Sequence, residues 1–300
     1  MTAAVIDAEQ GAADPAIRQQ RIERAFLDAC LLDVLAVKPG NVGVHAPGHG
    51  MEAIDFVRSA RAAAPAIAAC DATVGERIHA AVAATRAAVG TNTNLGIVLL
   101  AAPLAQAALR AQWPRTPTAL AASLEQVLAD LSVSDARLAF EAICLANPGG
   151  LGEAPRHDVR RPAQVTLLEA MREAANRDSI ARQYVTTYAD VLATGLARLM
   201  WARQAGFDHR WAATLVYLDF LSAHPDSHVA RKLGPDVAEA LRREASAQVE
   251  AVRQVEHPRV LRAQWHEWDA ALKARGLNPG TSADLTVATL FAGFVLATDR

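Results

Sequence analysis

Glu76 and the polar run Thr91-Asn92-Thr93-Asn94 are the first residues whose types and spacing suggest chemistry. Glu76, His79 and Arg86 share one face of a helix expected over residues 74–89. Hard cations prefer carboxylate oxygen and often take one or two carboxylates plus substrate phosphates, so Glu76 is a candidate magnesium ligand. The alternative is a solvated stripe with a Glu76–His79 contact. One side chain suffices for an N-cap, so the four at 91–94 indicate ligand recognition at the next helix.

The segment 37–51, VKPGNVGVHAPGHGM, is rich in glycine and proline, which supply backbone angles that other residues adopt only at a cost. It is therefore predicted to be a shaped loop with a function. The spacing His45-x3-His49 suggests a zinc pair, but such pairs bind best on one helix face, and the intervening proline and glycines exclude a helix. Two surface histidines are the other interpretation.

Three further segments have the same composition: 147–162, 224–235 and 275–285 each combine Gly or Pro with Asn, Asp, His, Lys or Arg. Turns alone rarely need this chemistry repeatedly, whereas loops on a rigid scaffold commonly carry ligand-binding groups. The four loops are predicted to converge on one phosphate-rich ligand.

Composition places the chain among ordinary globular proteins. Its 300 residues are 52% hydrophobic and 21% charged, and the formal net charge of -2 argues against bulk nucleic-acid binding. The apolar run from Leu95 is shorter than a membrane span of about 20 residues and contains Pro103, so a buried central helix is expected. Oligomeric state is left open.

Two features favour the cytoplasm. Residues 1–13 contain acids and no basic region before an apolar core, so they are predicted to be a disordered lead and not a secretory signal. Cys30, Cys70 and Cys144 lie in apolar helical contexts, which favours buried free thiols in a reducing compartment.

Helical spacing dominates the chain, and no strand pattern is visible, so an all-α, bundle-like single domain is predicted over 14–300. Asp14, Asp208 and Ser282 are expected N-caps, and Thr166 with Glu169 forms a capping box. Expected helices cover about 15–37, 51–70, 74–89, from 94, 118–131, 135–146, from 166, 179–204, from 208, two between 235 and 275, and from 282.

Four motifs occur in a recognisable order along the chain. They are Lys38-Pro39-Gly40, Glu76 upstream of Asn92-Thr93-x-x-Gly96, Asp226 with Arg231, and Asn278-Pro279-Gly280-Thr281-Ser282-Ala283-Asp284-Leu285. In this order they resemble the triphosphoribosyl-dephospho-coenzyme A synthases, which make the prosthetic-group precursor of citrate lyase and malonate decarboxylase.

The resemblance implies an all-α, magnesium-dependent transferase. A ribose hydroxyl of dephospho-coenzyme A attacks the anomeric carbon of ATP, adenine leaves, and the triphosphate stays on the product. It implies Lys38 and Arg231 as phosphate-binding residues, Glu76 and Asp284 as magnesium ligands, and Asp226 as the base, with Glu76 also counted as catalytic. The remaining expected binding residues are Asn41, Asn92, Thr93, Asn94, Gly149, Gly150 and Ser282.

Simpler roles exist for several of these residues. Lys38 can complement the C-terminus of the first helix, Asp226 can be the N-cap of a short helix, and Asp284 can be a first-turn acid. The single-site hypothesis makes a stricter demand: Lys38, Glu76, Asn92, Asp226 and Asp284 should line one cavity. It also predicts that Glu76→Gln lowers turnover without unfolding the protein.

Two departures from the synthases favour a divergent branch, of the kind found in archaea and in bacteria with methanopterin-linked metabolism. Asn94 and Leu95 stand where the typical motif has His and Lys, and Pro148-Gly149-Gly150-Leu151-Gly152 lacks the usual Arg and Glu. The acceptor is therefore open between dephospho-coenzyme A and a related metabolite. Phosphoryl transfer or hydrolysis on a nucleotide, and nucleotide binding without catalysis, are the alternatives.

Overall fold

The computed structural model describes residues 14–44, 47–111 and 113–297, and these residues form α-helices without a strand, as predicted. The helices are α2 (Pro15–Leu35), α3 (Ala53–Ala68), α4 (Val74–Val89), α5 (Leu95–Arg110), α6 (Pro117–Ala129), α7 (Val133–Ala146), α8 (Leu167–Ala174), α9 (Ser179–Val185), α10 (Leu196–Gln204), α11 (His209–Ala223), α12 (Ser227–Leu233), α13 (Pro235–Arg253), α14 (Arg262–Ala274) and α15 (Gly280–Leu296). A π-helical turn, Asp190–Gly195, precedes α10, and a 3₁₀ turn, Pro258–Leu261, precedes α14.

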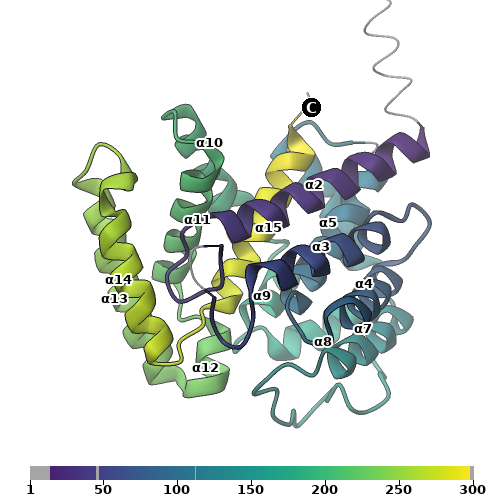
Figure 1. The fold of residues 1–300 in the computed structure, drawn as a ribbon. Helices are drawn as coiled ribbons and strands as arrows, with labels where there is room; N and C mark the ends of the chain where they lie inside the picture. The colour runs from purple at the N-terminus through teal and green to yellow at the C-terminus, as the bar shows by residue number, and fades with distance from the viewer. Residues whose placement is uncertain (1–13, 45–46, 112, 298–300) are drawn as a thin grey trace, which may run out of the picture.

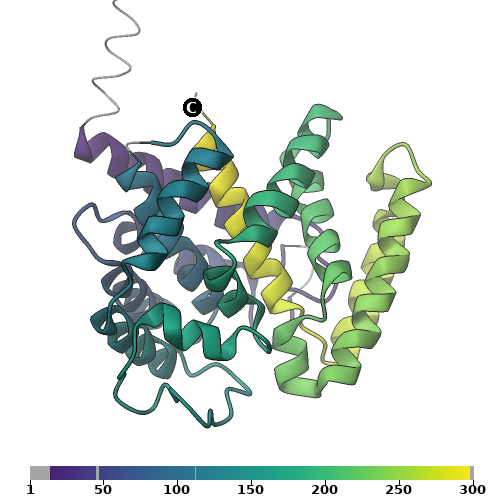
Figure 2. The same ribbon diagram turned by 180° about the vertical axis from the view of Figure 1, so that it is seen from behind.

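Helix α15 runs through the middle of the molecule, and α2, α5, α10 and α11 pack against it (Figure 1). Helices α3, α4 and α7 stack on one side, while α13 and α14 lie side by side at the opposite end, as both views show (Figure 2). A contiguous apolar core extends from Ile22 in α2 to Val295 in α15. This framework fixes the ends of the helices that surround the site.

Helix α5 is the buried central helix that its apolar sequence predicts. Pro103 lies inside it and has no N–H to donate to the carbonyl of Leu99. The Tyr184 hydroxyl donates to that carbonyl instead, at 2.6 Å, and the Tyr188 hydroxyl donates to the Leu100 carbonyl at 3.1 Å. The proline in α5 thus provides an acceptor that anchors residues 184–188.

We expect Tyr184→Phe to lower the free energy of unfolding by about 1–3 kcal/mol, because it leaves the buried Leu99 carbonyl without a donor. Pro103→Ala supplies an N–H at the position that would normally bond to that carbonyl. Tyr184→Phe should therefore cost at least about 0.5 kcal/mol less in the Pro103→Ala background. Urea unfolding of the parent, the single variants and the double variant measures the coupling, and additive effects would contradict this account.

The prediction of one helix over 179–204 is wrong. Helix α9 ends at Val185, Thr187 and Tyr188 have φ of 50° and 58°, and the π-helical turn follows from Asp190. A Cβ on Gly195 would collide with Thr289 of α15, so the turn relies on this glycine for its close packing. The break depends on contacts with α5 and α15, and the spacing of apolar residues within 179–204 gives no sign of these contacts.

Most predicted caps are confirmed: Asp14, Thr166 with Glu169, and Asp208 all accept hydrogen bonds from the first turns of their helices. Ser282 is not a cap, because α15 begins at Gly280 and Ser282 lies in its first turn.

The three cysteines are free, but only Cys30 is buried, whereas Cys70 is half-buried and Cys144 is exposed. The prediction of buried thiols is therefore wrong for Cys144. None of the helices in the described part of the chain is long and apolar enough to cross a membrane. The predicted lead at residues 1–13 lies outside the described residues.

Candidate active site

A cavity of about 880 Å³ lies where the N-terminal ends of α5 and α15 meet the loops before α9 and α12. Its wall includes Asn94 to Gly96 from the start of α5 and Gly280, Thr281 and Asp284 from the start of α15. Because the N-terminus of a helix carries partial positive charge and unpaired N–H groups, two long helices starting here favour an anionic ligand.

Lys38 is buried, with 4% of its surface exposed, and it contacts residues that line the cavity. Its Nζ donates to Asp33 Oδ2 at 2.6 Å and to Asn41 Oδ1 at 2.7 Å, and Asn41 Nδ2 donates to Asn278 Oδ1 at 2.9 Å. Asp33, Asn41 and Asn278 line the cavity, whereas Lys38 does not. The lysine therefore holds Asn41, which joins the first and last of the four loops, but does not reach the cavity itself.

The loop around Lys38 is rigid, as its composition predicts. Gly40 has a φ of +84° and donates its N–H to Asp269 Oδ1 at 2.8 Å. The Tyr217 hydroxyl donates to the Pro39 carbonyl at 2.7 Å, and the His49 ring lies 2.9 Å from the Gly40 carbonyl. His49 thus has a structural contact, and its predicted partner His45 lies outside the described residues.

Asp284 is the predicted site residue that the structure places most directly at the cavity. It lies against Gly96, where any Cβ would overlap its carboxylate, and it accepts no hydrogen bond from the described residues. Burial raises the pKa of Asp284 well above its usual value, and the negative charges of Asp33 and Asp226 raise it further. Asp33 Oδ1 is also buried without a donor. Asp284 and Asp33, whose Oδ2 is paired with Lys38, therefore both line this cavity.

Asp226 is an N-cap, the simpler of its two predicted roles. Its Oδ1 accepts from the N–H groups of His228 and Val229, and its Oδ2 accepts from the N–H and the hydroxyl of Ser282, each at 2.8 Å. These four bonds match the roughly four acceptor sites of a carboxylate. The prediction that Asp226 lines the cavity is wrong: the residue is 3% exposed and ties α12 to α15. Ser282, its partner, does not line the cavity either.

Glu76 also lies outside the cavity, so it does not meet the single-site expectation. It forms a capping box with Thr73: the Thr73 N–H donates to Glu76 Oε2 at 2.7 Å, and the Glu76 N–H donates to Thr73 Oγ1 at 3.3 Å. His79 lies 3.9 Å from Glu141, not beside Glu76. Spacing correctly predicted a polar helix face, but not what that face contacts.

We expect Glu76→Gln to leave turnover unchanged and to alter the free energy of unfolding by less than about 0.5 kcal/mol, because glutamine serves in the same capping box. Thr73→Ala is the matched test of the cap and should cost about 1 kcal/mol. Steady-state kinetics and urea unfolding give both readouts. A 100-fold loss of turnover in Glu76→Gln would contradict this account and support a role for Glu76 in the reaction.

Asn92, Thr93 and Asn94 all line the cavity. Asn92 Oδ1 accepts from the Leu95 N–H at 3.1 Å, and Thr93 Oγ1 donates to Ser59 Oγ at 2.6 Å. Asn94 Nδ2 is buried without a partner. One residue caps α5, one bonds to α3, and one keeps a free donor, so the expectation of surplus polar groups here is confirmed.

Arg231 lines the cavity as well, and the glycine loop supports it. Its Nε donates to the Gly149 carbonyl at 3.2 Å, and its Nη1 donates to Asp178 Oδ2 at 3.4 Å. Gly150 packs against Arg231 so closely that a Cβ there would lie 3.1 Å from its Cγ. Gly149 and Gly150 therefore do not line the cavity themselves but shape the position of Arg231.

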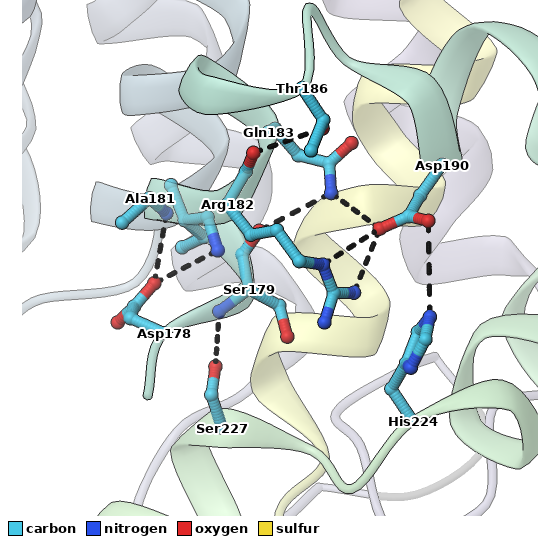
Figure 3. Close-up of polar contacts among 10 residues, drawn as sticks. Asp178, Ser179, Ala181, Arg182, Gln183, Thr186, Asp190, His224 and Ser227 are labelled. Atoms are coloured by element: carbon cyan, nitrogen blue, oxygen red, sulfur yellow. Dashed lines mark hydrogen bonds and ion pairs between the residues drawn. The ribbon is translucent and has the colours of Figure 1, made fainter. Parts of the chain in front are cut away.

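Several cavity residues were missed from the sequence. Asp33 lies within α2. Asp178 caps α9, Arg182 lies one turn into the same helix, and His224 lies on the other side of Asp190 from Arg182 (Figure 3). His228 Nε2 is buried without a partner, and burial, followed by the charges of Arg231 and Lys232, lowers the pKa of His228 to about 3. A signal for Asp33 existed in its spacing of five residues from Lys38. The others depend on tertiary contacts.

Comparison with known proteins adds to this geometry. Residues 19–299 match the family model CitG, described as ATP:dephospho-CoA triphosphoribosyl transferase. The fold is similar to the crystal structure of a protein from Archaeoglobus fulgidus assigned as a triphosphoribosyl-dephospho-coA synthase, with a TM-score of 0.61 and 25% identity, over 80% of this chain and 99% of that chain. No curated protein matches the sequence.

Proposed function

Since the chain belongs to the ATP:dephospho-CoA triphosphoribosyl transferase family, we propose that the cavity at the starts of α5 and α15 is where this transfer takes place. The chain is a transferase that moves a triphosphoribosyl group from ATP to dephospho-CoA. The observation that carries the site assignment is the meeting of Asn41, Asn94, Arg231 and Asp284, from four separate segments, at one cavity.

The reaction requires a ribose hydroxyl of dephospho-CoA to form a bond to the anomeric carbon of ATP while the bond to adenine breaks. The hydroxyl loses its proton, and adenine leaves with the bonding electrons and takes up a proton on the departing ring nitrogen, so one proton is lost and one is gained overall. His228 is neutral at pH 7 because of its lowered pKa, so its unpartnered ring nitrogen can accept a hydrogen bond from that hydroxyl. With Asp226 saturated by four donors, we assign the orientation of the hydroxyl to His228.

Asp33 and Asp284 replace the predicted pair Glu76 and Asp284 as the magnesium ligands in this proposal. Asp33 Oδ1 lacks a donor, and Asp284 accepts no hydrogen bond from the described residues. Burial is the largest cause of the raised pKa of Asp284, and the negative charges of Asp33 and Asp226 raise it further; a nearby cation would relieve this repulsion. Magnesium bound here would supply positive charge to the triphosphate. Magnesium is commonly held by one or two carboxylates together with substrate phosphates and water, so two aspartates suffice for the proposed site.

An apolar part of the cavity suits the acceptor. It lies between α7, α8 and the loop that joins them, and its lining includes Phe140, Ile143, Leu151, Val159, Leu167 and Met171. Dephospho-CoA carries a long pantetheine arm with few charges, and apolar walls with few polar groups bind such arms well. We place the arm here and the ribose hydroxyl toward His228.

The test is to incubate the purified protein with ATP, magnesium and dephospho-CoA and to analyse the products by mass spectrometry. Free adenine, together with an acceptor that has gained a triphosphoribosyl unit, is the expected result. Formation of ADP or AMP would indicate phosphoryl transfer or hydrolysis. Calorimetric binding of magnesium-ATP without any product would indicate a homologue that binds nucleotide without catalysis.

We also propose that the protein acts in the cytoplasm as a single domain over 14–300. The three free cysteines are consistent with a reducing compartment, and the contiguous core supports one domain. Its proposed partners are the two small-molecule substrates and not nucleic acid, which the net charge of -2 supports.

A further inference from the structure

The break after α9 brings together two charged residues that a continuous helix would separate. Arg182 and Asp190 are eight positions apart, which corresponds to about 12 Å along the axis of an α-helix. In the structure Arg182 Nη2 lies 2.8 Å from Asp190 Oδ2. The two left-handed residues between them, Thr187 and Tyr188, make this contact possible. Such conformations are costly for residues other than glycine and persist only where surrounding contacts hold them.

Asp190 holds the Arg182 guanidinium from behind. Arg182 Nε and Nη2 donate to Asp190 Oδ2 at 3.2 and 2.8 Å, and Gln183 Nε2 donates to the same oxygen at 2.7 Å (Figure 3). The other oxygen, Oδ1, lies 3.8 Å from His224 Nε2. Gln183 is fully buried, so the carboxylate has a fixed donor on its inner side. The contact with His224, followed by the hydrogen bonds from Arg182 and Gln183, lowers the pKa of Asp190 well below its usual value, so it is ionised at neutral pH.

The cavity lies on the other side of this cluster. Arg182 and His224 line the cavity, whereas Asp190 and Gln183 do not. The Arg182 side chain is 28% exposed, and its Nη1 donates no hydrogen bond to any residue in the described part of the chain. An ion pair that served only to close the helix break would not need to present a guanidinium nitrogen to a cavity. Arginine is suited to this position because its planar fork binds phosphate oxygens while its remaining nitrogens are held.

We propose that Arg182 binds a phosphate of the ATP triphosphate, and that Asp190 and Gln183 are positioning residues that hold it in place. This proposal rests on the assignment of the cavity as the transfer site. Arg231, at the same cavity, is engaged by Asp178 and by the Gly149 carbonyl. Arg156 and Arg177 also line the cavity, and each donates a hydrogen bond to Glu173. Arg182 adds a guanidinium whose Nη1 can bind a ligand.

Inorganic triphosphate is the direct probe, with binding measured by calorimetry on the full chain in the presence of magnesium. We expect Arg182→Gln to weaken triphosphate binding at least about tenfold, the scale of a lost charge-assisted hydrogen bond. Asp190→Asn, which leaves Arg182 in place but loosens it, should raise KM for ATP several-fold with a smaller change in kcat. Adenosine binding should be unchanged in both variants. Arg137→Gln is the matched control, because Arg137 pairs with Glu141 on an exposed face outside the cavity.

The outcomes separate this inference from the proposed function. Parent-like triphosphate affinity in a folded Arg182→Gln, with adenine still released by the parent, would overturn the inference and leave the function standing. Weakened triphosphate binding in Arg182→Gln, with no adenine released by the parent, would leave the inference standing and remove the function. If Arg182→Gln does not fold, Asp190→Asn decides: a raised KM for ATP supports the inference, and an unchanged KM overturns it.

Discussion

Asp284→Asn is expected to lower turnover at least about 100-fold, the scale of losing a preorganised electrostatic group, without lowering the melting temperature. The substitution keeps the shape of the side chain but removes a charge that a hard cation needs. It also removes a half-buried carboxylate near Asp33 and Asp226 that has no donor among the described residues. The variant should therefore be less active and at least as stable. Asp130→Asn, at an exposed ion pair outside the cavity, is the control and should leave turnover unchanged.

The stability of Asp284→Asn relative to the parent should depend on pH in a defined direction. Because the pKa of Asp284 is raised in the folded state, this carboxyl binds more protons when folded than when unfolded. The stability that the protonated Asp284 carboxyl contributes is fully present below the unfolded pKa of about 4. It is lost as pH rises through the folded pKa. The advantage of Asp284→Asn should thus grow from about pH 4 upward and then level off. Urea unfolding across this range without magnesium measures it, and an advantage that shrinks with rising pH would refute the assignment.

The effect of magnesium on the melting temperature is a second measurement, made on the parent, Asp284→Asn and Asp130→Asn. A cation at Asp33 and Asp284 binds the folded state, so it should raise the melting temperature of the parent in the presence of ATP. Asp284→Asn should show little of this increase, whereas Asp130→Asn should show all of it. An equal increase in all three proteins would place the cation elsewhere.

Local signals in the sequence predicted local structure well. Asp14, Asp208 and the Thr166–Glu169 pair each lie within four residues of the backbone groups they bind, so their roles can be recognised without a fold. The same kind of signal was present at Thr73-x-x-Glu76, which is a capping box. The hypotheses for Glu76 were a magnesium ligand or a solvated polar face, and the structure shows the capping box instead.

The rest depended on contacts between distant segments. The break at residues 186–189 follows from hydroxyl bonds to carbonyls in α5, about 85 residues earlier in the chain, and no periodicity in 179–204 reveals them. Arg182 faces the cavity because of this break. Asp33 lies in the last turn of α2, five residues before Lys38, and that spacing alone does not show that it lines the cavity. Asn92 was accessible from sequence because it belongs to a polar run before a helix start, and Asp284 because it lies in a motif that resembles the synthases.

Lys38→Met is expected to lower the free energy of unfolding by about 3–5 kcal/mol, the largest stability effect we predict. The ammonium is bonded to Asp33 and Asn41 and is almost fully buried, so its removal leaves the Asp33 carboxylate without compensation. Burial raises the pKa of Asp33, while the Lys38 charge and hydrogen bond act in the opposite direction. Without Lys38, only the cost of burying the Asp33 charge remains. Urea unfolding measures the loss.

The double variant Asp33→Leu/Lys38→Met separates this structural role from the chemistry. Replacing a buried ion pair with apolar residues of similar size is often neutral, so the double variant should recover most of the stability lost in Lys38→Met. It should not recover turnover, because it lacks Asp33, one of the two proposed magnesium ligands. Recovery of both would show that Asp33 serves only to pair with Lys38, and that Asp284 holds the cation without it. Recovery of neither would show that the loop at residues 37–44 needs the lysine to keep Gly40 and Asn41 in place.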